Sequence, residues 1–190
     1  MRANKNARFV CVDRDHSWEW VRKYIPHKYR SRILYIKSDV LKLTMGDIIK
    51  KVKERWPTAR WRHVKWVHAS PSCRSHSQAD RGRSRHRDEH GRPLTRLAKA
   101  DDKATRHVVQ LIEQIKEFAP TAMYTIENPE SKTFKMVPCI AKLRRTEGWR
   151  WLRCSYCKCA SRRLDKGKWP RKHTNILAWG VSHDFELPVC

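Results

Sequence analysis

Long apolar runs, glycine and acidic residues are all scarce in this sequence. No run approaches the roughly 20 apolar residues that a membrane-spanning helix needs, so we expect no membrane association. The first residues, MRANKNARFV, are too polar for the apolar part of a secretory signal, and we therefore expect an intracellular protein. Glycine occurs six times in 190 residues, which leaves little material for glycine-rich ligand loops.

The scarcity of acids leaves a strongly basic chain. There are 43 Lys and Arg against 19 Asp and Glu, a formal net charge of +24. Such an excess opposes compact folding unless a polyanion neutralises it, and it steers the chain toward phosphate backbones. We expect a nucleic-acid partner, with DNA preferred and RNA left open because charge does not distinguish them.

Seven cysteines are scattered along the chain, and nine tryptophans are many for this length. Without a secretory signal we expect reduced thiols rather than a disulfide framework. A structural zinc is a weak candidate, because the third cysteine crowds the usual ligand spacing. Its four ligands would be Cys154, Cys157, Cys159 and His173.

Short apolar runs alternate with helical patterns, which predicts an α/β fold with a mostly parallel sheet. We read the chain as a single domain over 1–190, with a mobile basic loop at 74–96 and a basic C-terminal segment at 139–190. The expected strands are 9–12 (buried), 33–36, 64–67, 121–126, 149–156 and 175–179. The expected helices are 18–24 (capped by Ser17), 46–56 and 101–118.

Chemistry-bearing residues follow four of these strands. Ligands of open parallel sheets bind outside the carboxyl ends of the strands. The strand ends carry Asp13 with Asp15, then Asp39, then the tetrapeptide SPSC ending at Cys73, and then Glu127 with Asn-Pro. We expect the acids to accept hydrogen bonds from a ribose or a base amine, and the thiol and Glu127 to face one crevice.

Cys73 and Glu127 together suit covalent attack on an electron-poor ring. Cations such as Arg74 beside a thiol favour its thiolate form, which is the nucleophile. A glutamate that faces a heterocycle can donate or accept a proton at a ring nitrogen. Taken singly, each residue has a structural alternative, a buried cysteine and a helix-capping glutamate.

Several segments resemble the C5-cytosine-specific DNA methyltransferases, in particular compact phage-type members. Residues 67–77 (VHASPSCRSHS) are similar to the nucleophile loop of that family, and 124–129 (YTIENP) to its Glu-Asn motif. The other similar segments are the cofactor-side strand 10–15 (VCVDRD), 38–40 (SDV), and 155–157 (SYC) followed by 171–176 (RKHTNI). The resemblance covers roughly residues 9 to 180 and implies a Rossmann-like methyltransferase fold.

The resemblance also implies roles for single residues. The Cys73 thiolate would add to carbon 6 of a flipped cytosine, Glu127 would engage the ring, and carbon 5 would take a methyl group from S-adenosylmethionine. No residue is assigned to the final removal of the carbon-5 proton. The implied cofactor contacts are Asp13, Asp15, Asp39, Ser70 and Pro71. The implied target contacts are Asn128, Pro129, Arg74, Ser77, Arg171 and Lys172.

Three departures from the family pattern keep other functions open. The chain shows no first strand with a Phe-x-Gly-x-Gly loop, so we expect a sheet that is truncated at its first strand, with a partner chain as a candidate to complete it. Ser72 stands where the family usually has proline, and 129–149 is short for a target-recognition domain. The alternative is a catalytically inactive nucleic-acid-binding protein on the same fold, for example a structural part of a ribonucleoprotein. Methylation of cytosine in RNA is a third possibility.

Overall fold

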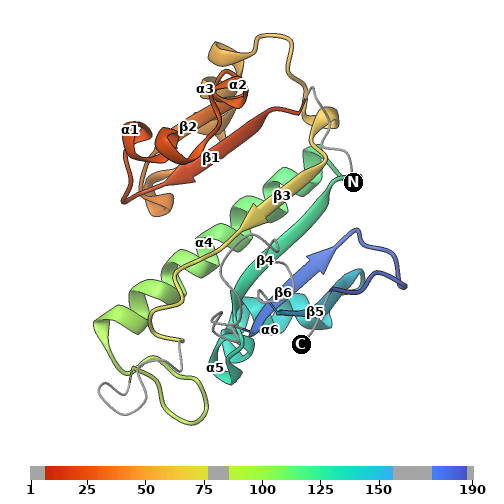
Figure 1. Ribbon diagram of the computed structural model, residues 1–190. Helices are drawn as coiled ribbons and strands as arrows, with labels where there is room; N and C mark the ends of the chain where they lie inside the picture. Colours follow the sequence, from red (N-terminus) through yellow and green to blue (C-terminus); the bar gives the residue numbers. More distant parts are fainter. Residues whose placement is uncertain (1–6, 77–85, 156–172, 188–190) are drawn as a thin grey trace, which may run out of the picture. The chain divides into compact units, whose positions relative to one another are not determined.

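The computed structural model describes residues 7–76, 86–155 and 173–187 (Figure 1). The chain forms two compact units, 1–63 and 64–190. That they make up one methyltransferase-like domain stays a prediction. No helix within the described ranges is long and apolar enough to cross a membrane.

The first unit is built on two parallel strands with one longer helix. Strand β1 (Phe9–Asp13) pairs with β2 (Ile33–Lys37), as predicted for 9–12 and 33–36. Helix α3 (Met45–Arg55) confirms the one predicted at 46–56. The short elements are α1 (Trp18–Val21), which Ser17 caps as predicted, η1 (Arg22–Tyr24), α2 (His27–Arg30), η2 (Val40–Lys42) and η3 (Trp61–His63).

A small core joins α3 to β2, while β1 remains open. The α3 helix begins at a capping box, in which Thr44 and Asp47 satisfy each other's backbone N–H groups. Ile48 on its apolar face then packs with Ile36 of β2. The strand β1 was expected to be buried, but Phe9 is 50% and Val10 41% exposed. It differs because, among the described residues, β1 pairs with β2 alone.

The second unit contains a four-stranded sheet in the order β3-β4-β6-β5. Its strands are β3 (Trp66–Ala69), β4 (Met123–Pro129), β5 (Trp149–Ser155) and β6 (His173–Trp179). Its helices are α4 (Arg96–Phe118), α5 (Lys132–Met136) and α6 (Pro138–Arg145). The pair β3/β4 is parallel and is connected through α4, whereas β6 is antiparallel to both of its neighbours. The predicted α/β class is confirmed, but the expectation of a mostly parallel sheet is not met here, because two of the three described strand pairs of this sheet are antiparallel.

Alternation along the strands gives this sheet one apolar and one polar face. Tyr124 and Ile126 of β4 point to the core, together with Leu177 of β6. The same core takes Ile112 from α4 and Ile140 from α6, so the helices cover this face. The residues in between, such as Thr125, Glu127 and Thr174, make their side-chain contacts on the other face. The candidate chemistry is therefore kept apart from the core.

Several boundaries differ from the prediction for identifiable reasons. Helix α4 begins at Arg96 rather than at 101, because the Thr95 hydroxyl caps it by accepting the N–H of Ala98. Strand β3 begins two residues later than expected, and β4 runs on through the Glu-Asn-Pro motif. The short helices α5 and α6 were not predicted. Proline at the first position of α6 is the local signal that marks its start.

Candidate active site

The loop that carries Cys73 is hydrogen-bonded to the end of β4. The Ser70 hydroxyl donates to a carboxylate oxygen of Glu127 over 2.5 Å. The side-chain amide of Asn128 donates to the carbonyl of Pro71 over 3.2 Å. Because β3 and β4 are parallel neighbours, their carboxyl ends meet at one edge of the sheet. The structure thus brings the predicted nucleophile loop to the predicted Glu-Asn motif.

Glu127 is buried, with 8% of its surface exposed, and both carboxylate oxygens accept hydroxyl donors. The second donor is Thr174 of β6, whose hydroxyl also lies 2.8 Å from the carbonyl oxygen of Asn128. Two hydroxyls, one from the loop after β3 and one from β6, fix the plane of the carboxylate. A carboxylate held in this way has a defined orientation.

Cys73 is a half-buried free thiol, and the loop is anchored again just beyond it. The backbone N–H of Ser75 donates to the carboxylate of Asp101 over 3.0 Å. The Ser75 hydroxyl accepts from the guanidinium of Arg87 at 3.0 Å. Cys73 therefore lies between two fixed points, Pro71 at β4 and Ser75 at the start of α4.

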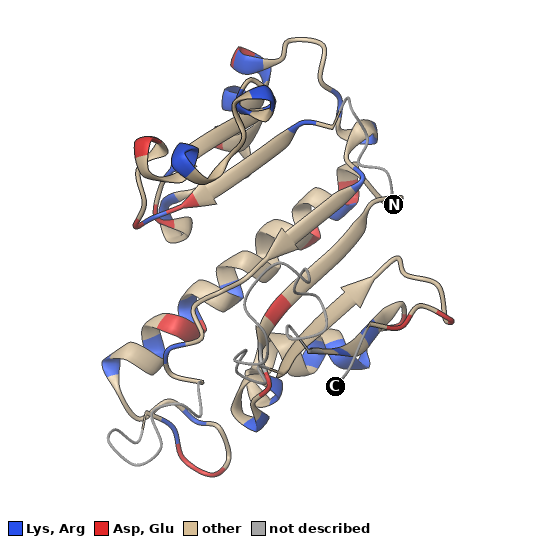
Figure 2. Ribbon diagram, viewed as in Figure 1, with Lys and Arg blue, Asp and Glu red and all other residues tan. Residues whose placement is uncertain are grey.

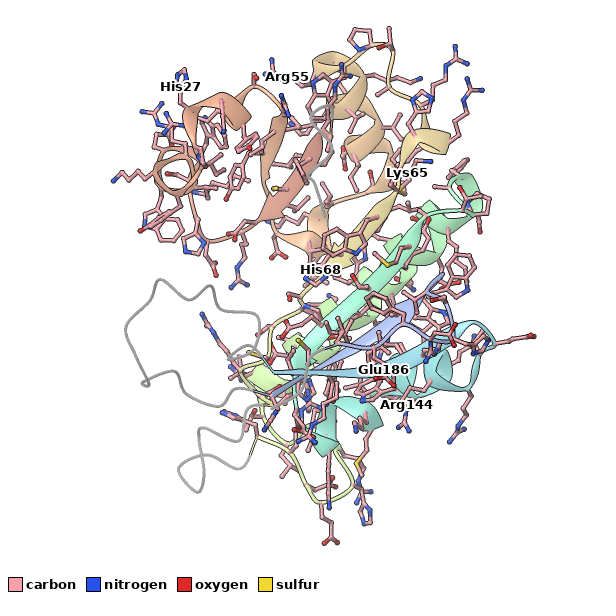
Figure 3. All side chains as sticks on the ribbon, turned by 45° about the vertical axis from the view of Figure 1, so that its right-hand side comes forward. His27, Arg55, Lys65, His68, Arg144 and Glu186 are labelled. Atoms are coloured by element: carbon pink, nitrogen blue, oxygen red, sulfur yellow. The ribbon has the colours of Figure 1, made fainter. Side chains whose placement is uncertain are left out.

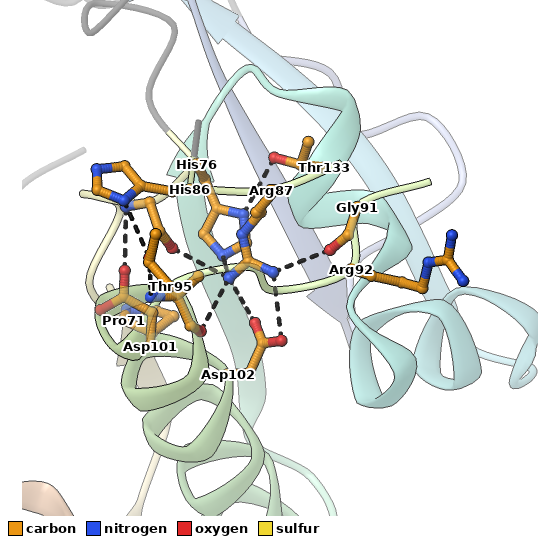
Figure 4. A network of polar contacts seen from close by, with 12 residues as sticks. Pro71, His76, His86, Arg87, Gly91, Arg92, Thr95, Asp101, Asp102 and Thr133 are labelled. Atoms are coloured by element: carbon orange, nitrogen blue, oxygen red, sulfur yellow. Dashed lines mark hydrogen bonds and ion pairs between the residues drawn. The ribbon is translucent and has the colours of Figure 1, made fainter. Parts of the chain in front are cut away.

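Arg87 is the centre of this second anchor (Figure 4). Its side chain is 2% exposed and forms an ion pair with Asp102 of α4 at 2.6 Å. Its guanidinium also donates to acceptors in several segments, namely the carbonyls of Gly91 (3.0 Å) and Ala98 (3.3 Å), Oγ of Ser75 (3.0 Å) and Nε2 of His76 (3.1 Å). One buried cation thus ties the nucleophile loop to α4.

His76 completes the anchor as a neutral ring. A guanidinium can only donate, so Nε2 of His76 is the acceptor and carries no proton. Burial lowers the pKa of His76 to about 4, and the charge of Arg87 acts in the same direction. The other ring nitrogen lies 3.2 Å from the hydroxyl of Thr133 in α5. The loop after Cys73 is thereby held from α4 and α5 together.

The loop predicted to be mobile over 74–96 is described at 74–76 and 86–96, and its mobility stays a prediction. Arg87 bridges to Pro93, and the carboxylate of Asp88 accepts the backbone N–H groups of His90 and Arg92. A buried ion pair and an Asx-type turn are the contacts of this polar stretch, which has no apolar periodicity. Residues 77–85 lie outside the described residues.

The cofactor-side acids belong to the first unit. Asp13 ends β1, and Asp39 follows β2 at the same edge, where the N–H of Ser38 donates to the carbonyl of Asp13. Partial burial acts to raise the pKa of Asp13, but hydrogen bonds from His16 and Asp15 outweigh it, and the pKa lies below its usual value. Asp39 caps η2 through the N–H of Leu41.

That these acids hold one half of S-adenosylmethionine stays a prediction. Carboxylates at the carboxyl edge of parallel strands suit the hydroxyls of a ribose and the amine of an adenine. Asp15 is exposed, and its carboxylate is paired with Arg14 at 2.7 Å. Within the described part of the first unit the one glycine is Gly46, inside α3, and no glycine loop is present for the methionine part.

The remaining predicted contacts are placed in part. Arg74 is exposed beside Cys73, and Pro129 ends β4. Ser77, Arg171, Lys172, Cys157 and Cys159 lie outside the described residues. Cys154 is buried and His173 half-buried at the paired ends of β5 and β6. Since two of its four ligands are not described, the zinc site stays a prediction. Among the described residues, no group of three His, Cys, Asp or Glu is arranged for a metal.

The contacts of three residues were not predicted, although one of them, Ser70, was expected at the site. Thr174 lies inside the segment 171–176 that was singled out, and its alternation with core residues of β6 is a signal that could have identified it. Ser70 was assigned to the cofactor, whereas its observed partner is Glu127. Arg87 lies in a run of arginines and histidines, and nothing in the sequence distinguishes it from its neighbours.

The parallel β3–α4–β4 unit and, separately, the parallel strand pair of the first unit are the elements of a Rossmann-like α/β fold. A crystal structure of the Dnmt2 methyltransferase from S. pombe has this fold, with a TM-score of 0.50 and 17% sequence identity. The match covers 95% of this chain and 44% of that one, so this chain spans less than half of the length of Dnmt2. No protein-family model matches the sequence, and no curated protein matches it significantly.

Proposed function

We propose that this chain is an S-adenosylmethionine-dependent DNA (cytosine-5)-methyltransferase with Cys73 as nucleophile and Glu127 as its partner on the base. The hydrogen bond from Ser70 to Glu127 carries the proposal, because it joins the nucleophile loop to the buried carboxylate. The methyltransferase-like fold supports it independently. Neither residue type alone would suffice, since cysteines and glutamates also serve structural roles.

The chemistry follows from the two side chains. A cytosine flipped out of the stack would place carbon 6 at the sulfur of Cys73, and formation of the S–C6 bond moves an electron pair toward carbon 5. Glu127 would hold a proton at ring nitrogen 3, which makes the ring accept that electron pair. S-adenosylmethionine, when bound, supplies an electrophilic methyl group for carbon 5. Loss of the carbon-5 proton to a base then lets the S–C6 bond break and frees Cys73.

Transfer of a tritium-labelled methyl group from S-adenosylmethionine to duplex DNA tests this proposal. We expect label on cytosine, and a fall of about 100-fold or more in Glu127→Gln, because acid–base groups typically contribute about 10²–10⁴. RNA of the same sequence is the parallel substrate. Label in RNA alone would overturn the assignment to DNA, and label in neither would overturn the enzymatic proposal for this chain by itself.

We further propose that a strand from a partner chain completes the first unit. The backbone of β1 hydrogen-bonds to β2 through the N–H of Phe9 and the carbonyl of Asp13. The backbone N–H and C=O groups of Val10 and Val12 therefore point to the opposite edge of β1. That edge has no strand partner among the described residues, and an isolated pair of strands is marginally stable. An apolar edge strand of this kind is a template for pairing.

Nucleic-acid binding without catalysis is the second candidate, and the charge of +24 favours it. Basic side chains lie on both Trp151 and Trp179, for example Lys135 5.0 Å from the Trp151 ring and Lys116 4.2 Å from the Trp179 ring. Lys and Arg also crowd the end of α6 (Figure 2). Aromatic rings and cations are the groups that bind single strands.

This second candidate predicts tight and salt-sensitive binding that Cys73→Ala leaves unchanged. Each neutralised phosphate contributes about 0.9 to the slope of log affinity against log salt on duplex DNA. Fluorescence anisotropy with labelled DNA between low and physiological salt measures the slope. A nearly flat dependence would contradict both this candidate and the interpretation of the charge.

A further inference from the structure

A continuous line of polar side chains runs along the polar face of β3 and β4. The indole N–H of Trp66 donates to the Thr125 hydroxyl over 2.8 Å, and this hydroxyl lies 2.9 Å from Nδ1 of His68. Nε2 of His68 lies 3.5 Å from the Ser70 hydroxyl, at the outer limit of a hydrogen bond. Ser70 in turn donates to Glu127 over 2.5 Å. The line ends at the buried carboxylate of the candidate site.

Hydrogen counts and contact distances together indicate the direction of this line. The one hydrogen of the Ser70 hydroxyl goes to Glu127, so in a hydrogen bond between Ser70 and His68 the donor is Nε2–H of His68. In the neutral ring Nδ1 is then an acceptor. The one hydrogen of the Thr125 hydroxyl has two acceptors within reach, Nδ1 of His68 at 2.9 Å and the carbonyl of Val67 at 3.4 Å, and the shorter contact favours donation to His68. Trp66 donates to Thr125. Every donor therefore points toward Glu127.

The two ends of the line differ in their access to water. His68 is exposed on β3 (Figure 3), whereas Glu127 is 8% exposed. Ser70 is exposed as well and lies between them. The line thus joins a titratable ring at the surface to a carboxylate that water reaches poorly.

We propose that His68 is a positioning residue that acts on Glu127 through Ser70 and passes protons between solvent and the carboxylate. A protonated His68 releases its Nε2 proton to the oxygen of Ser70, and Ser70 releases its own proton to Glu127. One N–H bond and one O–H bond break while two O–H bonds form. The positive charge on His68 and the negative charge on Glu127 are both neutralised. The role of His68 in catalysis rests on the proposed function, whereas the hydrogen bonds from Trp66 to Glu127 are independent of it.

The surroundings of His68 keep its ring neutral at pH 7. Burial of part of the ring lowers the pKa of His68, and the negative charge of Glu127 acts in the opposite direction. The side chains that contact the ring from β3 and β4, Trp66, Ser70 and Thr125, carry no charge. Glu127 is therefore the charged group to which the titration of His68 should respond.

Nuclear magnetic resonance of the imidazole nitrogens tests the line without any enzymatic activity. The full chain is labelled with ¹⁵N, and His68 is assigned by the signals that disappear in His68→Gln. We expect the Nε2–H tautomer at neutral pH. In Glu127→Gln the titration midpoint of His68 should move to lower pH, because a negative charge that favours the protonated ring is lost. In Ser70→Ala, which keeps the charge, the preference for the Nε2–H tautomer should decrease.

A ring in the Nδ1–H tautomer, or a midpoint that is the same in the wild type and Glu127→Gln, would overturn the proposal. The exposed His90, which is paired with Glu89, is the matched control, and its titration should be unchanged in both variants. Because neither result depends on methyl transfer, failure here is distinguishable from failure of the proposed function.

The catalytic role has its own readout, the pH profile of methyl transfer. His68→Phe removes the donor and should slow transfer roughly tenfold, a part of the 10²–10⁴ that acid–base groups typically supply. His68→Gln can still donate to Ser70 but cannot take up a proton. It should restore much of the rate while the inflection due to His68 disappears from the profile. An inflection that survives in His68→Gln would show that His68 is structural only.

Discussion

Arg87→Met is expected to lower the free energy of unfolding by about 3–5 kcal/mol, the usual cost of breaking a buried ion pair from one side. Methionine fills a similar volume, but it leaves the carboxylate of Asp102 buried with no cation at 2.6 Å. It also removes the donor to Ser75 and to the carbonyl of Gly91. Urea unfolding followed by circular dichroism measures the loss.

The control for this variant lies five residues away. Arg92 pairs with Asp88 at the same distance, 2.6 Å, but its side chain is 74% exposed. Exposed pairs contribute about 0–1 kcal/mol, so Arg92→Met should be nearly neutral. Equal losses in the two variants would contradict the role given to Arg87. The double variant Arg87→Met/Asp102→Leu should recover part of the loss, since no charge is then left unpaired.

The same anchor predicts a loss of stability in mild acid. His76 has a pKa of about 4 in the folded chain and its ordinary value of 6.5 when unfolded. The unfolded state therefore binds more protons between these values, and stability falls as pH decreases from 6.5 toward 4. In Arg87→Met the folded pKa should rise, because the cation that opposes protonation is gone, and the pH dependence over this window should become shallower. An unchanged dependence would show that His76 is not the responsible group.

The sequence was sufficient for what depends on local pattern. Apolar runs that end in acids predicted β1 and β2, and helical spacing after Thr44 predicted α3. The order of the Cys loop, an intervening helix and the Glu-Asn motif was sufficient to place Ser70 and Glu127 at one edge of a sheet, because parallel strands bring their carboxyl ends together.

What the sequence left open depends on pairing between distant segments. Arg87 becomes important only because folding brings Asp102 and Ser75 to it, and a run of arginines offers no local sign of this. Thr174 reaches Glu127 because β6 is antiparallel to β4, a pairing that strand patterns alone do not specify. The exposure of β1 likewise follows from its lack of a second neighbour among the described residues, not from its composition.

Cys73→Ala is expected to abolish covalent capture of DNA that contains 5-fluorocytosine. Attack of the sulfur on carbon 6 and methylation of carbon 5 leave a fluorine where a proton would otherwise depart, so the S–C6 bond cannot be broken and the adduct accumulates. Alanine has no nucleophile, and the loss should be complete rather than partial. The nucleophile loop is anchored through the backbone of Pro71 and Ser75 and not through the Cys73 side chain, so the variant should still fold.

A second cysteine provides the matched control. Cys139 of α6 is a half-buried free thiol like Cys73, but it lies against the helix-covered core and not in the nucleophile loop. Cys139→Ala should therefore retain the adduct. Loss in both variants would indicate that folding, rather than a particular thiol, was affected.

Mass spectrometry of this adduct tests the central claim most directly. The full chain is incubated with S-adenosylmethionine and 5-fluorocytosine DNA, and the DNA-bearing peptide is identified after digestion. We predict attachment at Cys73, with no adduct in Cys73→Ala and an unchanged yield in Cys139→Ala. Attachment at another residue, or no adduct although the chain binds both DNA and S-adenosylmethionine, would contradict the assignment of Cys73 as a cytosine nucleophile.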